Sequence, residues 1–150
     1  MYESLTEATK FHAINQENWV GEALAEYKHE IYNLISENNI KTILDYGCGK
    51  AKFHPLLFNN IKVPGSPMGV TVTPYDPAVT KFSNKPTGQY DLVLCIDVME
   101  HIQEDKIEEV LKDLFSYSNK VFLTITCYPA MQILPNGKNA HYTIKEPDWW

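Results

Sequence analysis

The sequence has 150 residues, the length of one domain that can bury a substantial core. Hydrophobic residues make up 44% and charged residues 21%, so a soluble globular fold is expected. The formal net charge of -6 and the scattered positions of Lys and Arg argue against a surface that binds nucleic acid, and favour a small or neutral substrate.

The cysteines and the N-terminus indicate the compartment. Cys48, Cys95 and Cys127 are far apart and lack C-x-x-C spacing, so we expect reduced, buried thiols and neither disulfides nor a zinc site. The N-terminus carries Glu3 and Glu7 and has no apolar core of a signal peptide. No apolar run approaches the roughly 18 residues of a membrane span, so we predict a cytoplasmic protein.

Residues 1–40 are predicted to form a helical segment that packs on the rest of the domain. Apolar residues recur at helical spacing from about Asn15 to Glu37. Gly21 interrupts this pattern, and it either weakens one long helix or marks a break between two helices. Residues 1–14 are mixed and give no clear prediction.

The stretch Ile43–Phe53 reads I-L-D-Y-G-C-G-K-A-K-F, which predicts a buried strand followed by a glycine turn. Gly47 and Gly49 lie where a backbone must bend tightly and approach a bound group. Because ligands bind at the carboxyl ends of strands in open α/β sheets, we expect a nucleotide-like ligand here. Two glycines after an apolar run also occur in plain turns, so other features must distinguish these interpretations.

The next elements place an acidic residue near this turn. A short helix is expected within residues 51–60, where Pro55 limits its length. A β-branched strand over residues 69–73 then ends at Pro74. Asp76 therefore follows a strand, and it lies beside the glycine turn if the two strands are neighbours.

The second half of the chain predicts a sheet centre and one more helix. Residues 90–96 form a near-continuous apolar run, as in a parallel strand covered on both faces. An amphipathic helix begins near Glu104, and a last strand spans residues 121–126. Residues 77–89 are polar, contain two prolines and are too few for a helix and another strand.

The order of strand, glycine turn, helix and strand ending in an acid, followed by Y-D-L-V-x-x-x-x-V-M-E-H-I, resembles the class I S-adenosylmethionine-dependent methyltransferases. The likeness covers about residues 41–128 and extends to the D-Y-G-C-G-K turn and late N-A-H segment of small bacterial or phage members. It implies an α/β fold, a Rossmann-like three-layer sandwich with a reduced, mostly parallel sheet. Residues 41–150 would bind S-adenosylmethionine, and residues 1–40 would pack on them in one compact domain.

The resemblance also implies how the cofactor is bound. Asp45, Gly47 and Gly49 match positions that pack against its methionine part, and Asp76 matches the acid that accepts hydrogen bonds from the ribose hydroxyls. Carbonyls around Cys95 and Ile96 match those that face its amino group. The full set of expected cofactor-binding residues is Asp45, Gly47, Cys48, Gly49, Asp76, Cys95, Ile96 and Asp97.

The chain departs from the family pattern in three places. Ala51 replaces the third glycine of the turn, and residues 77–89 leave out the usual third strand and its helix. The sixth and seventh strands are missing as well. The fold is then naturally reduced, or the chain is truncated, or a second subunit covers a sheet edge in a homodimer.

Asp97, Glu100, His101 and His141 are expected to share one crevice at the carboxyl ends of the strands. Two carboxylates and two imidazoles suit Mg²⁺ or Mn²⁺. The D-x-x-E-H spacing resembles the E-x-x-E-H metal motif of some O-methyltransferases, in which the metal lowers the pKa of the acceptor hydroxyl. In the alternative without metal, His101 or His141 is the general base. The expected catalytic residues are His101, His141 and Asp97.

The predicted function is methyl transfer from S-adenosylmethionine to a small-molecule acceptor, by O-methylation, with no membrane or nucleic-acid partner. One alternative is a non-catalytic module that binds S-adenosylmethionine or a nucleotide, motivated by the reduced sheet and Ala51. Another is a nicotinamide-dependent oxidoreductase, which the missing third glycine of G-x-G-x-x-G disfavours. The N/D-P-P-Y tetrapeptide of amino-directed nucleic-acid methyltransferases is absent from the sequence.

Overall fold

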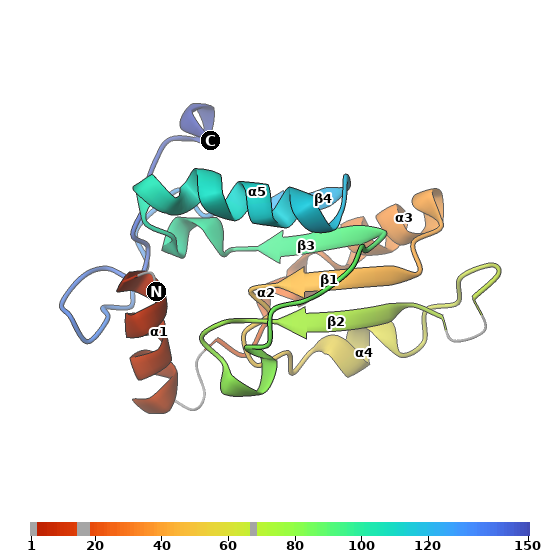
Figure 1. The fold of residues 1–150 in the computed structure, drawn as a ribbon, viewed down its shortest axis with the longest axis horizontal. Coiled ribbons are helices and arrows are strands. Elements are labelled where there is room, and N and C mark those ends of the chain that lie inside the picture. Colours follow the sequence, from red (N-terminus) through yellow and green to blue (C-terminus); the bar gives the residue numbers. More distant parts are fainter. Residues whose placement is uncertain (1–2, 15–18, 67–68) are drawn as a thin grey trace.

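A computed structural model describes residues 3–14, 19–66 and 69–150. Its centre is a sheet of four parallel strands in the order β2-β1-β3-β4 (Figure 1). The strands are β1 (Thr42–Tyr46), β2 (Thr71–Tyr75), β3 (Leu92–Ile96) and β4 (Val121–Thr124). This arrangement confirms the predicted α/β, Rossmann-like fold with a reduced parallel sheet.

Helices cover both faces of the sheet, and α1 stands beyond the carboxyl ends of its strands (Figure 1). Helices α3 and α4 lie on one face and α5 on the other. The helices are α1 (Glu3–Ile14), α2 (Ala23–Glu26), α3 (Lys28–Asn38), α4 (His54–Phe58) and α5 (Ile107–Tyr117). Short 3-10 turns are found at Thr80–Phe82, Met99–His101, Glu104–Lys106 and Pro147–Trp149. Among the described residues, no helix has both the length and the apolar character needed to cross a membrane.

The core has one apolar cluster on each face of the sheet. Leu94 of β3 packs in the cluster with Ile35 of α3, and its neighbour Val93 packs in the cluster with Leu114 of α5. Successive side chains of a strand point to opposite faces, and all five residues of β3 are buried. The prediction that this strand is covered on both faces is therefore confirmed.

The N-terminal segment differs from the predicted long helix. The start of that helix, near Asn15, lies outside the described residues, and residues 20–22 are not helical. Gly21 has a φ of +84°, and a Cβ there would lie 2.9 Å from the Cys48 carbonyl oxygen. The second alternative, a break at Gly21, is the correct one, because the chain turns here to pack against the glycine turn.

Strand β2 continues past its predicted end, through Pro74 to Tyr75. The Thr71 amide donates to Lys41 O of the segment before β1, so Thr71 points its backbone groups toward β1. Successive residues of a strand point these groups to opposite sides, and Pro74, three positions later, points away from β1. Pro74 therefore turns its nitrogen toward the open edge, where no ladder bond is lost.

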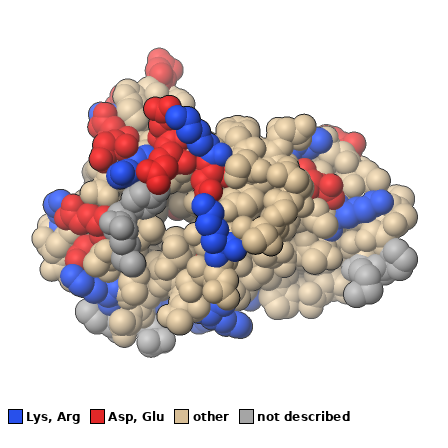
Figure 2. Space-filling model, in the orientation of Figure 1, with Lys and Arg blue, Asp and Glu red and all other residues tan. Residues whose placement is uncertain are grey.

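Residues 77–91 cross one face of the sheet beside α5 (Figure 1). Apart from the 3-10 turn at Thr80–Phe82 they are irregular, in agreement with the prediction that no third strand fits there. Lys85 holds the segment to α5 through an ion pair of 2.8 Å with Asp113. Figure 2 shows Lys and acidic side chains interleaved over α5 and the C-terminal segment; Lys112 and Glu108 pair there at 2.6 Å.

Candidate active site

A cavity of about 880 Å³ opens at the carboxyl ends of the strands. Its walls come from α1, α5, residues 77–85 and the ends of β1, β2 and β3. The volume lies within the range of roughly 300–1,000 Å³ that is usual for small-molecule sites. The strand ends contribute Gly47, Gly49, Asp76, Ile96, Asp97 and Val98 to the lining. The cavity thus occupies the place where open α/β sheets bind ligands.

The glycine turn after β1 is built for residues without a side chain. Gly47 has a φ of +81°, and a Cβ there would lie 2.3 Å from Cγ2 of Val98. Gly49 has a φ of +55°, and its Cβ would lie 2.3 Å from the carbonyl oxygen of Trp19. The amides of Gly47 and Cys48 donate to Tyr75 O at 2.7 and 3.1 Å. Side chains are excluded from this turn by both conformation and space.

Asp76 joins the end of β2 to this turn. Its Oδ2 accepts a hydrogen bond from the Gly49 amide at 2.9 Å, and its Oδ1 accepts one from the Ala78 amide at 2.8 Å. Burial raises the pKa of the carboxyl, and these two hydrogen bonds oppose the rise. Each carboxylate oxygen has a further lone pair, so Asp76 can still accept a hydroxyl of a ligand in the cavity.

The segment before α2 covers the glycine turn, a feature that the sequence analysis missed. The Lys50 amide donates to Trp19 O at 2.9 Å, and the Lys52 amide donates to Val20 O at 3.1 Å. Ala51, which replaces the third glycine, has a φ of +50°. The turn therefore keeps a glycine-like conformation at Ala51, at a strain of about 1 kcal/mol.

The predicted cofactor-binding residues fall into two groups. Gly47, Gly49, Asp76, Ile96 and Asp97 line the cavity, whereas Asp45, Cys48 and Cys95 are not among its lining residues. The Asp45 carboxylate instead accepts a hydrogen bond from Nε2 of His54 at 2.5 Å. No motif in the sequence indicated this pair.

Two of the three cysteine thiols are unsuited to nucleophilic chemistry. Cys48 and Cys95 are buried, and burial raises the pKa of both thiols. All three cysteines are free, as expected. Among them, Cys127 is only partly buried.

Glu100, His101 and His141 come together beside the cavity. One ligand atom from each lies within 4.8 Å of the others. His101 Nδ1–H donates to Ala140 O at 2.8 Å, and His141 Nδ1–H donates to Tyr128 O at 2.6 Å. Because a carbonyl oxygen only accepts, both imidazoles keep a lone pair on Nε2. Glu100 Oε1 accepts from the Thr126 amide at 3.0 Å, while the buried Oε2 has no partner among the described residues.

Burial controls the charge of this cluster. It raises the pKa of Glu100 to about 7 and lowers the pKa of His101 to about 4. Near neutral pH, His101 is therefore an uncharged imidazole beside a carboxyl that is only partly ionised. Two imidazoles and one carboxyl group with ligand atoms within 4.8 Å of one another can accept a proton or bind a cation.

The structure does not bring Asp97 into this cluster. Asp97 has a φ of +51°, so the chain turns before the 3-10 turn Met99–His101 begins. Thr124 of β4 holds its carboxylate, with 2.9 Å between Thr124 Oγ1 and Asp97 Oδ1. The expectation that positions 97 and 100 share a face assumed a regular helix, and the chain has none there. Asp97 instead lines the cavity next to Ile96.

Comparison with known proteins gives one match. A family model described as a methyltransferase domain matches residues 17–144, a range that contains β1 to β4, the glycine turn and His141 but not α1. No curated protein and no solved structure matches the chain.

Proposed function

The chain belongs to the class I S-adenosylmethionine-dependent methyltransferases, and from this premise we propose that it transfers the methyl group to an oxygen atom of a small molecule. The observation that supports an oxygen acceptor is the cluster of Glu100, His101 and His141 beside the cavity. A hydroxyl must lose its proton during methyl transfer, and a neutral imidazole can receive it. The family match indicates methyl transfer in general rather than the hydride transfer of a nicotinamide enzyme.

The residues of the cavity fit the cofactor. S-adenosylmethionine, when bound, supplies an electrophilic methyl group on sulfur. The Asp76 carboxylate has lone pairs to accept hydrogen bonds from ribose hydroxyls, and Gly47 and Gly49 keep side chains out of the turn beside it. We place the cofactor at this turn, which is the position that the sequence analysis predicted.

The proton of the acceptor has a defined route in this proposal. His101 lines the cavity, and its Nδ1–H is held by Ala140 O, so its Nε2 lone pair is the available base. His141 is oriented in the same way by Tyr128 O, and its ring centroid lies 4.8 Å from that of His101. Either imidazole can take the hydroxyl proton, and Glu100 stabilises the imidazolium that forms.

A metal-assisted version is a second candidate, favoured by the buried Oε2 of Glu100, which has no partner in the part of the chain that the structure describes. The donor set of two imidazole nitrogens and one carboxylate oxygen fits a divalent ion. Without Asp97 this set has fewer hard oxygen ligands than predicted, and so it favours Mn²⁺ over Mg²⁺. A bound ion would lower the pKa of the acceptor hydroxyl.

Two measurements test the proposal. Calorimetric titration with S-adenosylhomocysteine, the product form of the cofactor, should show one site per chain, and NAD should show no binding. Label from methyl-labelled S-adenosylmethionine should then appear on hydroxyl compounds in a panel of alcohols, phenols, amines and carboxylates. Label found on amines alone would contradict the oxygen acceptor.

The same assay separates the two candidates. Activity that is full in EDTA assigns His101 or His141 as base without metal, and activity that EDTA removes and Mn²⁺ restores assigns the metal. His101→Ala and His141→Ala should each lower activity at least about 100-fold, the usual contribution of a general base. His29→Ala is the matched control, because His29 is exposed on α3. Full activity in both cluster variants would remove these histidines from the mechanism.

A further inference from the structure

Helix α1 contributes a wall of the cavity that lies outside the matched methyltransferase residues. Leu5, Ala8 and His12, which are three and four positions apart, face the cavity from one side of the helix. An adjoining side of the helix holds it in place, because Phe11 packs in a cluster with Leu134 and Ala140. This chain therefore supplies its own wall for the part of the cavity nearest α1.

His12 is the polar group of that wall. It is 8% exposed, and its Nδ1 is buried without a hydrogen-bond partner among the described residues. Burial, with a smaller contribution from the charge of Lys50, lowers the pKa of His12 to about 4. His12 is thus an uncharged imidazole that lines the cavity. Because its Nδ1 is closed to solvent, Nε2 is the hydrogen-bonding atom that His12 can offer to a molecule in the cavity.

Aromatic rings connect His12 to the proposed catalytic cluster. The His12 ring lies 4.5 Å from that of Trp19, edge to face, and the Trp19 ring lies 5.7 Å from that of His101. All three residues line the cavity. A molecule in contact with Trp19 can therefore reach both His12 and the base.

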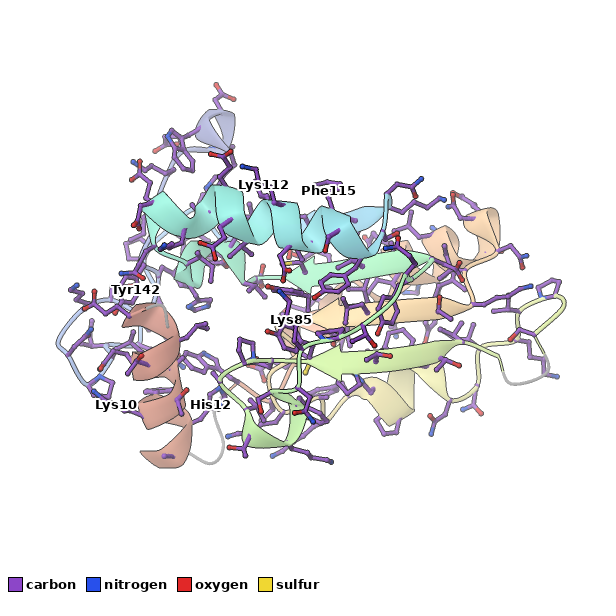
Figure 3. The ribbon with its side chains drawn as sticks, viewed as in Figure 1. Lys10, His12, Lys85, Lys112, Phe115 and Tyr142 are labelled. Carbon is purple, nitrogen blue, oxygen red and sulfur yellow. The ribbon has the colours of Figure 1, made fainter. Side chains whose placement is uncertain are left out.

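The charged residues of α5 lie elsewhere in the lining. Lys112 and Asp113 belong to α5, and Lys85 pairs with Asp113 at 2.8 Å. In Figure 3, His12 lies on the side of α1 nearer the sheet, whereas Lys85 lies in front of the strands, away from α1. At the α1 end, Leu5, Ala8, Trp19 and Ile102 provide apolar surface, and His12 is uncharged near neutral pH.

We propose that α1 and Trp19 form the acceptor subsite, and that it takes an uncharged aromatic compound whose hydroxyl hydrogen-bonds to His12. This inference rests on the proposed methyl transfer and names its class of acceptor. A flat ring matches the edge-to-face packing around Trp19. An acceptor without charge matches the apolar surface that Leu5, Ala8 and Trp19 provide. A hydroxyl can donate and accept, so it satisfies His12 in either tautomer. His12 is then the residue that determines specificity.

The experiment uses three bicyclic probes that differ in one property each. They are 2-naphthol, the anionic 2-naphthoate, and decahydro-2-naphthol, which keeps the hydroxyl but lacks the flat rings. Each is titrated into the full chain saturated with S-adenosylhomocysteine, and binding is followed by calorimetry and ligand-observed NMR. We expect 2-naphthol to bind at least about tenfold more tightly than either of the others.

Variants of His12 test its role. His12→Phe should weaken the binding of 2-naphthol at least about fivefold and leave the affinity for S-adenosylhomocysteine unchanged. His12→Gln restores a hydrogen-bonding group, so it should recover part of the lost affinity for 2-naphthol. His29→Phe, on the exposed face of α3, should change neither. Circular dichroism checks that each variant is folded. If His12→Phe does not fold, the binding of 2-naphthol to His12→Gln alone tests the role of His12.

The outcomes separate this inference from the proposed function. If S-adenosylhomocysteine binds but 2-naphthol binds no better than its saturated or anionic counterpart, the acceptor class is wrong and methyl transfer stands. If 2-naphthol binds equally well to wild type and both His12 variants, the role of His12 is wrong. If S-adenosylhomocysteine does not bind, the cofactor assignment fails and the acceptor subsite fails with it.

Discussion

The Asp76 carboxylate and the Gly49 amide are joined by a hydrogen bond of 2.9 Å, which links the end of β2 to the turn after β1. The two strands are neighbours in register, with Tyr46 opposite Tyr75, so one side chain can span their ends. Asp76 consequently does two jobs at once. It fixes the shape of the glycine turn, and it presents a carboxylate to the cavity.

Replacing Asp76 should therefore weaken cofactor binding. Asp76→Ala removes the hydrogen bonds from the Gly49 and Ala78 amides and the carboxylate that we propose as acceptor for the ribose hydroxyls. We expect the affinity for S-adenosylhomocysteine to fall at least tenfold, or about 1.4 kcal/mol, measured by calorimetry. Asp105→Ala, at an exposed acid in the turn before α5, is the control and should bind normally. Equal affinity in both variants would show that the cofactor does not use Asp76.

The space around Gly47 predicts a large effect on stability. Gly47→Ala places a Cβ 2.3 Å from Val98 Cγ2 at a φ of +81°. Gly88→Ala has the same conformational strain, at a φ of +86°, but no atom within 4 Å of the added Cβ. Urea unfolding should show a loss of about 1–2 kcal/mol for Gly88→Ala and a clearly larger loss for Gly47→Ala. The prediction is wrong if the two variants are equally stable.

Burial of His12 predicts a dependence of stability on pH. Its folded pKa of about 4 lies below the unfolded value of 6.5. As pH falls below 6.5 the unfolded chain binds a proton that the folded chain does not, so the free energy of unfolding decreases until about pH 4. Between pH 7 and pH 5 this group should contribute a loss of about 2 kcal/mol.

Urea unfolding at the two pH values measures this loss. His12→Phe should be less sensitive to the change in pH than wild type by about that amount, because it has no imidazole to protonate. His29→Phe removes an exposed histidine and should keep the wild-type pH dependence. The same dependence in wild type and His12→Phe would show that His12 is accessible to protons in the folded state.

The sheet edges lead to a prediction about assembly. At one edge, Pro74 turns its nitrogen toward the outside of β2, so this edge has one backbone donor fewer. At the other edge, β4 pairs only with β3 among the described strands, so its outer backbone groups are open to pairing. We expect a homodimer that forms along β4, where Leu123 is 37% exposed. Light scattering at micromolar concentration should give twice the chain mass. Leu123→Lys should give a monomer, and Leu56→Lys, on α4, should not. A wild-type monomer at every concentration would contradict this.

The sequence predicted the parts of the fold that depend on local patterns. The apolar run at residues 90–96 is a buried central strand because both of its faces are covered, and that condition leaves no polar positions in the sequence. The position of Asp76 next to the glycine turn also followed from one rule, since parallel neighbours end at the same edge.

The missed features depend on contacts between distant segments. Asp97 leaves the predicted cluster because Thr124, on another strand, binds its carboxylate. Helix α1 was not predicted, because its cavity face mixes small, apolar and polar residues and so lacks a regular apolar pattern. The ion pair that holds it joins Glu3 to the distant residue Lys138, which no local pattern reveals. His12 and Trp19 became candidates for the site only when the fold brought them to His101.

The anchoring of α1 has a consequence for the order of folding. Glu3 pairs with Lys138 at 2.8 Å, and the two residues are 135 positions apart in a chain of 150. Closing so long a loop is entropically costly and slow compared with pairing of nearby segments. We expect the sheet to form first and α1 to dock last. During refolding, the secondary structure of the sheet should therefore return before the native fluorescence of Trp19. A chain still emerging from the ribosome should not close the proposed acceptor subsite until residue 138 is available.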